Sequence, residues 1–114
     1  MWHETEDFHE VLEIVDVAYL TRYQLERTSS PEERDQLNEA SHSHRMNTEA
    51  ANSMKASSII LHPLPRIEEI RWNVDNNPRA KYFQQAANGV YVRMAWLLAI
   101  FNPEKAEQIL KKSF

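Results

Sequence analysis

The sequence contains no cysteine and only one glycine, Gly89, and each absence excludes a class of chemistry. Without cysteine the chain has no disulfide framework, no thiolate metal site and no cysteine nucleophile. With a single glycine it has no glycine-rich loop of the kind that cradles phosphate in nucleotide-binding proteins. Any phosphate group must therefore be bound in another way.

Long hydrophobic runs and an excess of positive charge are also absent. The longest strongly apolar run, residues 95–101, is far shorter than the roughly 20 residues that span a bilayer. The net charge of -4 indicates neither a nucleic-acid surface nor an anionic membrane surface. The acidic residues 1–7 lack the features of a signal peptide. We expect a soluble cytoplasmic protein that binds no cofactor.

The 114 residues suit one small domain, and their apolar pattern predicts an α/β fold. Residues 6–13 have helical spacing and lead into an apolar, β-branched strand at residues 14–20. A second buried strand at residues 58–61 ends at two prolines. This order favours a partial doubly wound parallel sheet with flanking helices.

The helices are marked by capping residues. Ser30, with Pro31 next and Glu33 three positions on, forms a capping box that opens a helix to about residue 40. Residues 39–51 are polar and irregular and predict a mobile loop with one short strand or helix start. Thr48 opens a helix that runs to about residue 55.

The C-terminal third predicts two further helices. From Tyr82 to Phe101 apolar residues recur every three or four positions, with a break allowed at residues 88–89. Asn102 and Pro103 then begin a last short helix. The fold class expected is therefore α/β with long C-terminal helices.

Arg22 and Gln24 follow the first predicted strand and are the first candidate ligand-binding residues. In open α/β sheets, ligands bind outside the carboxyl ends of the strands. If the chain stays extended, the two side chains point the same way. An arginine fork and an amide suit a small anionic amino acid. The alternative is a surface ion pair of Arg22 with Asp16 or Glu26.

Pro63, Leu64 and Pro65 follow the second predicted strand and are the second candidate. Prolines have no N–H group, so this turn offers carbonyl oxygens without matching donors, which suits an NH2 group. A cis Leu64–Pro65 bond would aim these carbonyls. The alternatives are a plain loop and, for His62, a hydrogen-bonded core histidine.

Other polar residues predict structural roles. His42 and His44 lie two apart in a polar segment without a third ligand, so we expect no metal site. Glu68 and Glu69 are expected to pair with Arg66 or Arg71.

Three runs, residues 15–27, 61–70 and 74–95, together resemble the aspartate carbamoyltransferase family in sequence, order and spacing. The run His62-Pro63-Leu64-Pro65-Arg66 is the most specific, because the similar ornithine enzymes carry cysteine at the position of Pro63. The resemblance covers nearly all of this chain but only about the last third of the family's usual length. It implies a partial aspartate-binding α/β domain at residues 1–81. Residues 82–114 would be helices that pack back on a carbamoyl-phosphate domain not present here.

The resemblance also implies roles for the candidate residues. Arg22 and Gln24 would hold the carboxylates of L-aspartate, and the carbonyls of Pro63, Leu64 and Pro65 would hold the amine of carbamoyl phosphate. The family's phosphate-binding and catalytic residues have no counterpart here, so no catalytic residue is expected and activity alone would be negligible. The full enzyme would be a homotrimer.

Residues 41–47 depart from the family, which has an apolar strand there. The polar replacement predicts a lost strand or an edge strand. An alternative to the enzyme interpretation is therefore an inactive remnant that serves as an interaction module.

Overall fold

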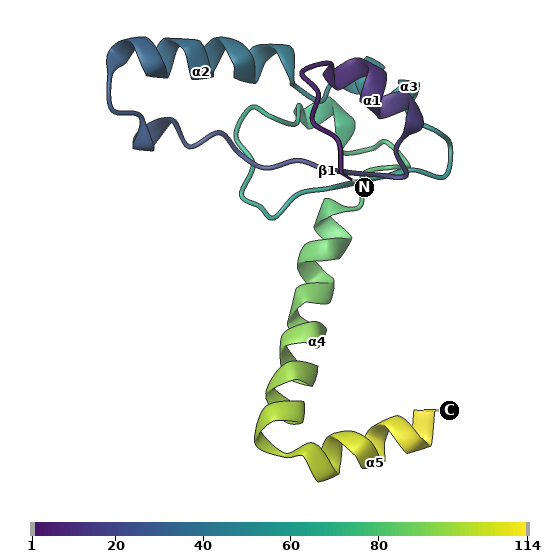
Figure 1. Ribbon diagram of the computed structural model, residues 1–114. Helices are drawn as coiled ribbons and strands as arrows, with labels where there is room; N and C mark the ends of the chain where they lie inside the picture. Colours follow the sequence, from purple (N-terminus) through teal and green to yellow (C-terminus); the bar gives the residue numbers. More distant parts are fainter. Residues whose placement is uncertain (1, 114) are drawn as a thin grey trace. The chain divides into compact units, whose positions relative to one another are not determined.

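The computed structural model describes residues 2–113, which fall into two compact units (Figure 1). The first unit ends at Tyr82 and contains a two-stranded sheet with helices, and the second consists of the rest of α4 and α5. The expected α/β class with long C-terminal helices is confirmed. The interpretation of the two units as parts of larger domains stays a prediction.

The first unit begins with α1 (Phe8–Ile14), β1 (Val17–Tyr19) and the short 3-10 helix η1 (Leu25–Arg27). Asp7 caps α1 by accepting a hydrogen bond from the Glu10 N–H at 2.9 Å. Strand β1 is shorter than predicted, because Ile14 ends the helix instead of starting the strand. A short β-branched run does not by itself distinguish a helix end from a strand.

Helix α2 (Pro31–Ser43) has the predicted capping box: Ser30 Oγ accepts from the Glu33 N–H at 3.1 Å. The helix continues past residue 40, so the prediction of a mobile loop at residues 39–51 is wrong. Helix α3 (Thr48–Ser53) follows closely and is capped by Asn47, whose Oδ1 accepts from the Ala50 N–H at 2.9 Å. Both caps satisfy amide groups that a helix start leaves unpaired.

Strand β2 (Ile59–Leu61) lies parallel to β1, with Val17 opposite Ile59 and Tyr19 opposite Leu61. On its other edge, β2 forms a single parallel bridge between Ile60 and Ala80. Near residue 46, where a lost strand or an edge strand was expected, the described residues form a single parallel bridge between Met46 and Ile70. The sheet is thus small and parallel.

The core of the first unit lies where the sheet meets α1, α3 and the 3-10 helix η2 (Trp72–Val74), and Figure 1 shows α1 and α3 close together. Met46, Ile60 and Val74 are fully buried in it. Burial of side chains of this size stabilises a fold by about 1.5–3 kcal/mol each. The remaining core residues are Leu12, Ala50, Ala51, Met54, Ile70 and Tyr82.

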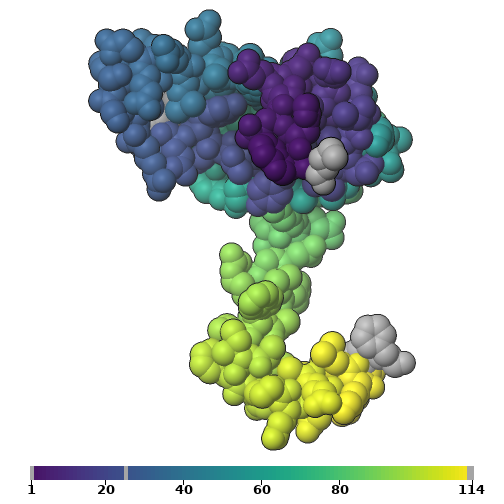
Figure 2. Space-filling model, viewed as in Figure 1, coloured from purple at the N-terminus to yellow at the C-terminus, as the bar shows by residue number. Residues whose placement is uncertain are grey.

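Helices α4 (Tyr82–Phe101) and α5 (Pro103–Ser113) follow. Helix α4 is continuous through Gly89, so the allowed break does not occur. Asn102 caps α5, since its Oδ1 accepts from the Lys105 N–H at 3.1 Å. Most large apolar side chains of these helices are exposed. Figure 2 draws the surface of α4 and α5 in green to yellow. Among the described residues, no helix combines the length and the apolar character that crossing a membrane requires.

Candidate functional site

The register of the sheet brings the two candidate segments to one edge. Tyr19 and Leu61 are opposite one another at the carboxyl ends of β1 and β2, and the Leu20 N–H donates to the Leu61 carbonyl at 3.0 Å. Residues 21–24 and 62–65 therefore leave the sheet side by side. This is the position at which parallel α/β sheets bind ligands.

Arg22 and Gln24 lie in the first segment, between β1 and η1. Arg22 forms an ion pair with Glu26, as the alternative interpretation predicted, and its side chain is 37% exposed. Asp16, the other candidate partner, pairs with Lys55 at 2.9 Å. Gln24 is exposed, and its carbonyl accepts from the Arg27 N–H at 2.9 Å. An exposed pair such as Arg22 with Glu26 is weak, so a ligand carboxylate competes with it readily.

The second segment forms a tight turn in which the Leu64–Pro65 bond is cis, the form that the sequence left open. Leu64 has a φ of 53°, in the left-handed region that residues with a side chain seldom adopt. The Leu64 N–H donates to His62 Nδ1 at 2.8 Å. Among residues 2–113, no hydrogen bond ends on the carbonyl oxygens of Pro63, Leu64 or Pro65. The turn therefore presents acceptors that the described residues leave open.

His62 and Glu69 form a buried pair beneath this turn. Nε2 of His62 lies 2.8 Å from Oε1 of Glu69, and the two side chains are 1% and 5% exposed. Glu69 also accepts from the N–H groups of Ile67 at 3.2 Å and of Glu68 at 3.0 Å. Burial alone would raise the pKa of Glu69, but hydrogen bonds from its own amide, from these two amides and from His62 outweigh it and lower the pKa.

Arg66, the residue after the turn, contacts Asp75 and Tyr82. Its Nη2 lies 2.7 Å from Oδ2 of Asp75, and its Nη1 lies 3.0 Å from the Tyr82 hydroxyl. The Tyr82 hydroxyl also donates to Asp75. The hydrogen bond from Arg66 is the main reason that the pKa of Asp75 is lowered. Burial, aided by Asp75, raises the pKa of Tyr82 to about 12.

The acidic pairs only partly match the sequence-based predictions. Glu68 pairs with Arg71 at 3.0 Å, as predicted, and also with Arg45 at 3.2 Å. The prediction that Glu69 pairs with an arginine is wrong, because this carboxylate faces His62 and backbone amides. His62 is the satisfied buried histidine of the alternative interpretation. The sequence signal for this pair is weak, since only the chain turn brings residues 62 and 69 together.

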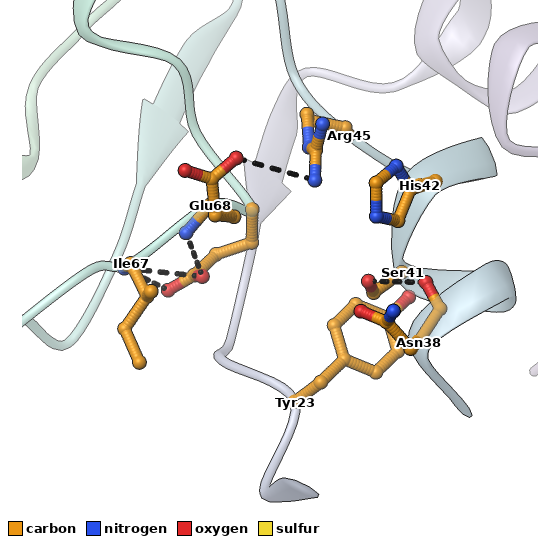
Figure 3. A pocket seen from close by; sticks show the side chains of 8 residues that line it. Tyr23, Asn38, Ser41, His42, Arg45, Ile67 and Glu68 are labelled. Atoms are coloured by element: carbon orange, nitrogen blue, oxygen red, sulfur yellow. Dashed lines mark hydrogen bonds and ion pairs between the residues drawn. The ribbon is translucent and has the colours of Figure 1, made fainter. Parts of the chain in front are cut away.

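A pocket of about 280 Å³ lies beside Tyr23 of the first segment (Figure 3). In Figure 3 the ring of Tyr23 lies beside Asn38 and Ser41, and a dashed line joins Glu68 to Arg45. Burial raises the pKa of Tyr23. Arg22, Gln24 and residues 63–65 do not line this pocket, whose walls are Tyr23, Asn38, Ser41, His42, Arg45, Ile67, Glu68 and Glu69.

His42 and His44 do not gather further ligands. The His44 ring contacts the backbone carbonyls of Ala40 at 2.8 Å and Glu6 at 3.2 Å. Within residues 2–113, no group of three or more histidine, aspartate or glutamate side chains is placed to hold a metal ion.

The fold is an α/β domain with a small parallel sheet, and the candidate site lies at the carboxyl ends of its two strands. The family described as "Aspartate/ornithine carbamoyltransferase, Asp/Orn binding domain" matches residues 1–100. The chain belongs to this family. The resemblance seen in the sequence is thereby confirmed.

Relatives and solved structures agree with this assignment. Aspartate carbamoyltransferase 1, chloroplastic, of Pisum sativum is 43% identical over 96 residues, covering 84% of this chain and 24% of the pea protein. The aspartate transcarbamoylase of Trypanosoma cruzi in complex with carbamoyl phosphate is 36% identical, with a TM-score of 0.71, covering 78% of this chain and 27% of that one. Its complex with carbamoyl aspartate and phosphate is 37% identical, with a TM-score of 0.69 and the same coverage. The chain spans about a quarter of the length of these proteins.

Proposed function

We propose that this chain supplies the aspartate-binding part of an aspartate carbamoyltransferase. In that reaction the amine of L-aspartate attacks the carbamoyl carbon of carbamoyl phosphate. A C–N bond forms, the C–O bond to phosphate breaks, and the amine loses a proton. The products are N-carbamoyl-L-aspartate, a pyrimidine precursor, and phosphate. The observation that carries the proposal is the parallel register that brings residues 21–24 and 62–65 to one sheet edge.

Arg22 and Gln24 are proposed to hold the carboxylates of L-aspartate. The guanidinium of Arg22 is accessible, and its present partner is an exposed carboxylate, Glu26. A ligand carboxylate can take the same donors in a two-point contact. The amide of Gln24 offers a donor for the second carboxylate.

Pro63, Leu64 and Pro65 are proposed to hold the carbamoyl amine through their carbonyl oxygens. These oxygens accept no hydrogen bond from residues 2–113, and an NH2 group has two donors to offer. The methyl group of an acetyl group has a similar size but no N–H group to donate, so it would leave these carbonyls unpaired. The turn thus favours a carbamoyl group over an acetyl group.

The remaining catalytic groups are proposed to come from a carbamoyl-phosphate-binding lobe outside these 114 residues. Without the groups that neutralise phosphate and stabilise the oxyanion, which are worth about 3–4 kcal/mol for one donor, the chain alone would be nearly inactive. The expected homotrimer and the cytoplasmic location also stay predictions. The alternative of an inactive interaction module gains no support from the relatives.

Two ligands that differ in one group provide the test. N-carbamoyl-L-aspartate and N-acetyl-L-aspartate share both carboxylates, but only the first carries the NH2 group. In titrations of the 15N-labelled chain followed by NMR, we expect both to shift the amides of residues 21–24 and the first to bind more tightly. Arg22→Ala should weaken both ligands at least tenfold, whereas Arg34→Ala on exposed α2 should weaken neither. Absence of binding by the unmodified chain at millimolar ligand would overturn the proposal.

A further inference from the structure

We propose that His62 is a positioning residue for the carbamoyl group: it holds the Leu64 N–H so that the turn carbonyls face the ligand. The proposal rests on the function proposed above and adds a residue that does not itself touch the ligand. It starts from the two hydrogen bonds that the ring of His62 makes in opposite directions.

The hydrogen bonds fix the tautomer of His62. The Leu64 N–H donates to Nδ1 at 2.8 Å, so Nδ1 carries no proton. Nε2 must then carry the proton and donate it to Glu69 Oε1 at 2.8 Å. A protonated ring would place an N–H group against the N–H group of Leu64. The turn as observed therefore requires a neutral imidazole with its proton on Nε2.

Glu69 holds that tautomer in place. Its carboxylate accepts from His62 and from the amides of Ile67 and Glu68, so it is ionised and fixed on several sides. A carboxylate that can only accept selects the donor nitrogen of the ring. The pair is buried, so water does not compete for either bond. Residues 67–69 and the imidazole thus form a rigid support for the turn.

Leu64 is the residue through which His62 acts on the site. Its φ of 53° is unfavourable for a leucine, so the surrounding contacts must hold it. Two such contacts are present: the hydrogen bond to His62 Nδ1 and the packing of the Leu64 side chain on the core. The carbonyls of Pro63 and Leu64 belong to the two peptide units on either side of the Leu64 α-carbon. If the Nδ1 bond is lost, these acceptors are free to turn away from the ligand.

Two substitutions of His62 each keep one of its two hydrogen bonds and remove the other. In His62→Asn the side-chain oxygen takes the place of Nδ1 and keeps an acceptor for the Leu64 N–H. In His62→Gln the terminal amide takes the place of Nε2 and keeps a donor for Glu69, but offers nothing to Leu64. The readout is the ratio of affinities for N-carbamoyl-L-aspartate and N-acetyl-L-aspartate. A loss of packing alone would not change this ratio, because both ligands share the contacts to Arg22 and Gln24.

For the unmodified chain we expect about tenfold preference for the carbamoyl ligand, from one or two hydrogen bonds. His62→Gln should reduce this preference to about one, and His62→Asn should keep most of it. Equal ratios for both variants and the unmodified chain would overturn the role of His62 and leave the proposed function intact. Absence of any binding by the unmodified chain would instead overturn the proposed function.

A second measurement covers the case in which a variant does not fold. In the unmodified chain, 15N NMR of His62 should show a bare Nδ1 and a protonated Nε2, with scalar coupling from the Leu64 N–H to Nδ1. Saturation with N-carbamoyl-L-aspartate should shift the Leu64 amide more than saturation with the acetyl ligand. A proton on Nδ1, or equal shifts with both ligands, would contradict the proposal.

Discussion

Arg66 and Asp75 are joined at two points: Nη2 of Arg66 lies 2.7 Å from Oδ2 of Asp75, and Nη1 faces Oδ1. The Tyr82 hydroxyl contacts both members of the pair. Arg66 directly follows the turn formed by residues 62–65, and Tyr82 begins α4. The cluster of Arg66, Asp75 and Tyr82 therefore links the end of the turn to the first residue of the helix. Its contribution to stability can be measured without any ligand.

Asp75→Asn should destabilise the fold by about 1.5–3 kcal/mol, because asparagine removes the charge and one of the two oxygens that face Arg66. The free energy of unfolding is obtained from urea titrations at pH 7. Asp35→Asn is the matched control, since Asp35 lies exposed on α2, and a change within about 0.5 kcal/mol is expected there. If the two variants lose the same stability, Arg66 and Asp75 do not form the contact described.

The pKa of Tyr82, raised to about 12, predicts a loss of stability in alkali. Tyrosine in the unfolded chain ionises near its ordinary value of 10.0, whereas folded Tyr82 keeps its proton until about 12. The stabilisation is therefore complete below pH 10 and is lost as the pH rises towards 12. Unfolding free energies at pH 9 and pH 12 should fall more for the unmodified chain than for Tyr82→Phe. Tyr91→Phe, on an exposed position of α4, should behave like the unmodified chain.

Glu69 predicts the opposite dependence in acid. Because hydrogen bonds lower its pKa in the folded chain from 4.5, the unfolded chain takes up the proton first as the pH falls. The stabilisation is present above about pH 4.5 and is lost below it. Glu69→Gln should be less stable at pH 7 and should show a smaller further loss between pH 5 and pH 3. Glu49→Gln, exposed on α3, serves as control, and an equal acid dependence of the two variants would contradict this assignment.

Much of the fold could be predicted because its signals are local. The capping box at Ser30 and the apolar period from Tyr82 each depend on neighbouring residues, and a helix begins at each place as predicted. The extension of α2 to Ser43 was missed because its polar sequence has no clear apolar face. Met46, a lone apolar residue in that stretch, was not recognised as fully buried. Its burial depends on a bridge to Ile70, which lies 24 positions further along the chain.

In the candidate site, too, the sequence predicted local features but not contacts between residues further apart in the chain. The HPLPR run identified the family and the turn, because proline restricts the backbone in a way that is visible in the sequence. The partners of the turn were not visible. The sequence suggested that Glu69 would pair with an arginine by charge, whereas in the structure burial selects a hydrogen-bonded histidine. Opposite charge alone therefore does not predict which groups pair in the core, because the path of the chain decides which groups meet there.

The last prediction concerns the exposed apolar side chains of α4 and α5. A groove of about 570 Å³ lies between these helices and includes Trp96 and Ile100, whose side chains are 68% and 64% exposed. An apolar surface of this kind favours association in water. We expect the mass measured by sedimentation equilibrium to rise with concentration for the unmodified chain. The double variant Trp96→Gln and Ile100→Gln should weaken association at least tenfold, since two large side chains no longer become buried. Trp72→Gln removes a still more exposed tryptophan from the first unit and should leave association unchanged, so an equal effect of both variants would place the contact elsewhere.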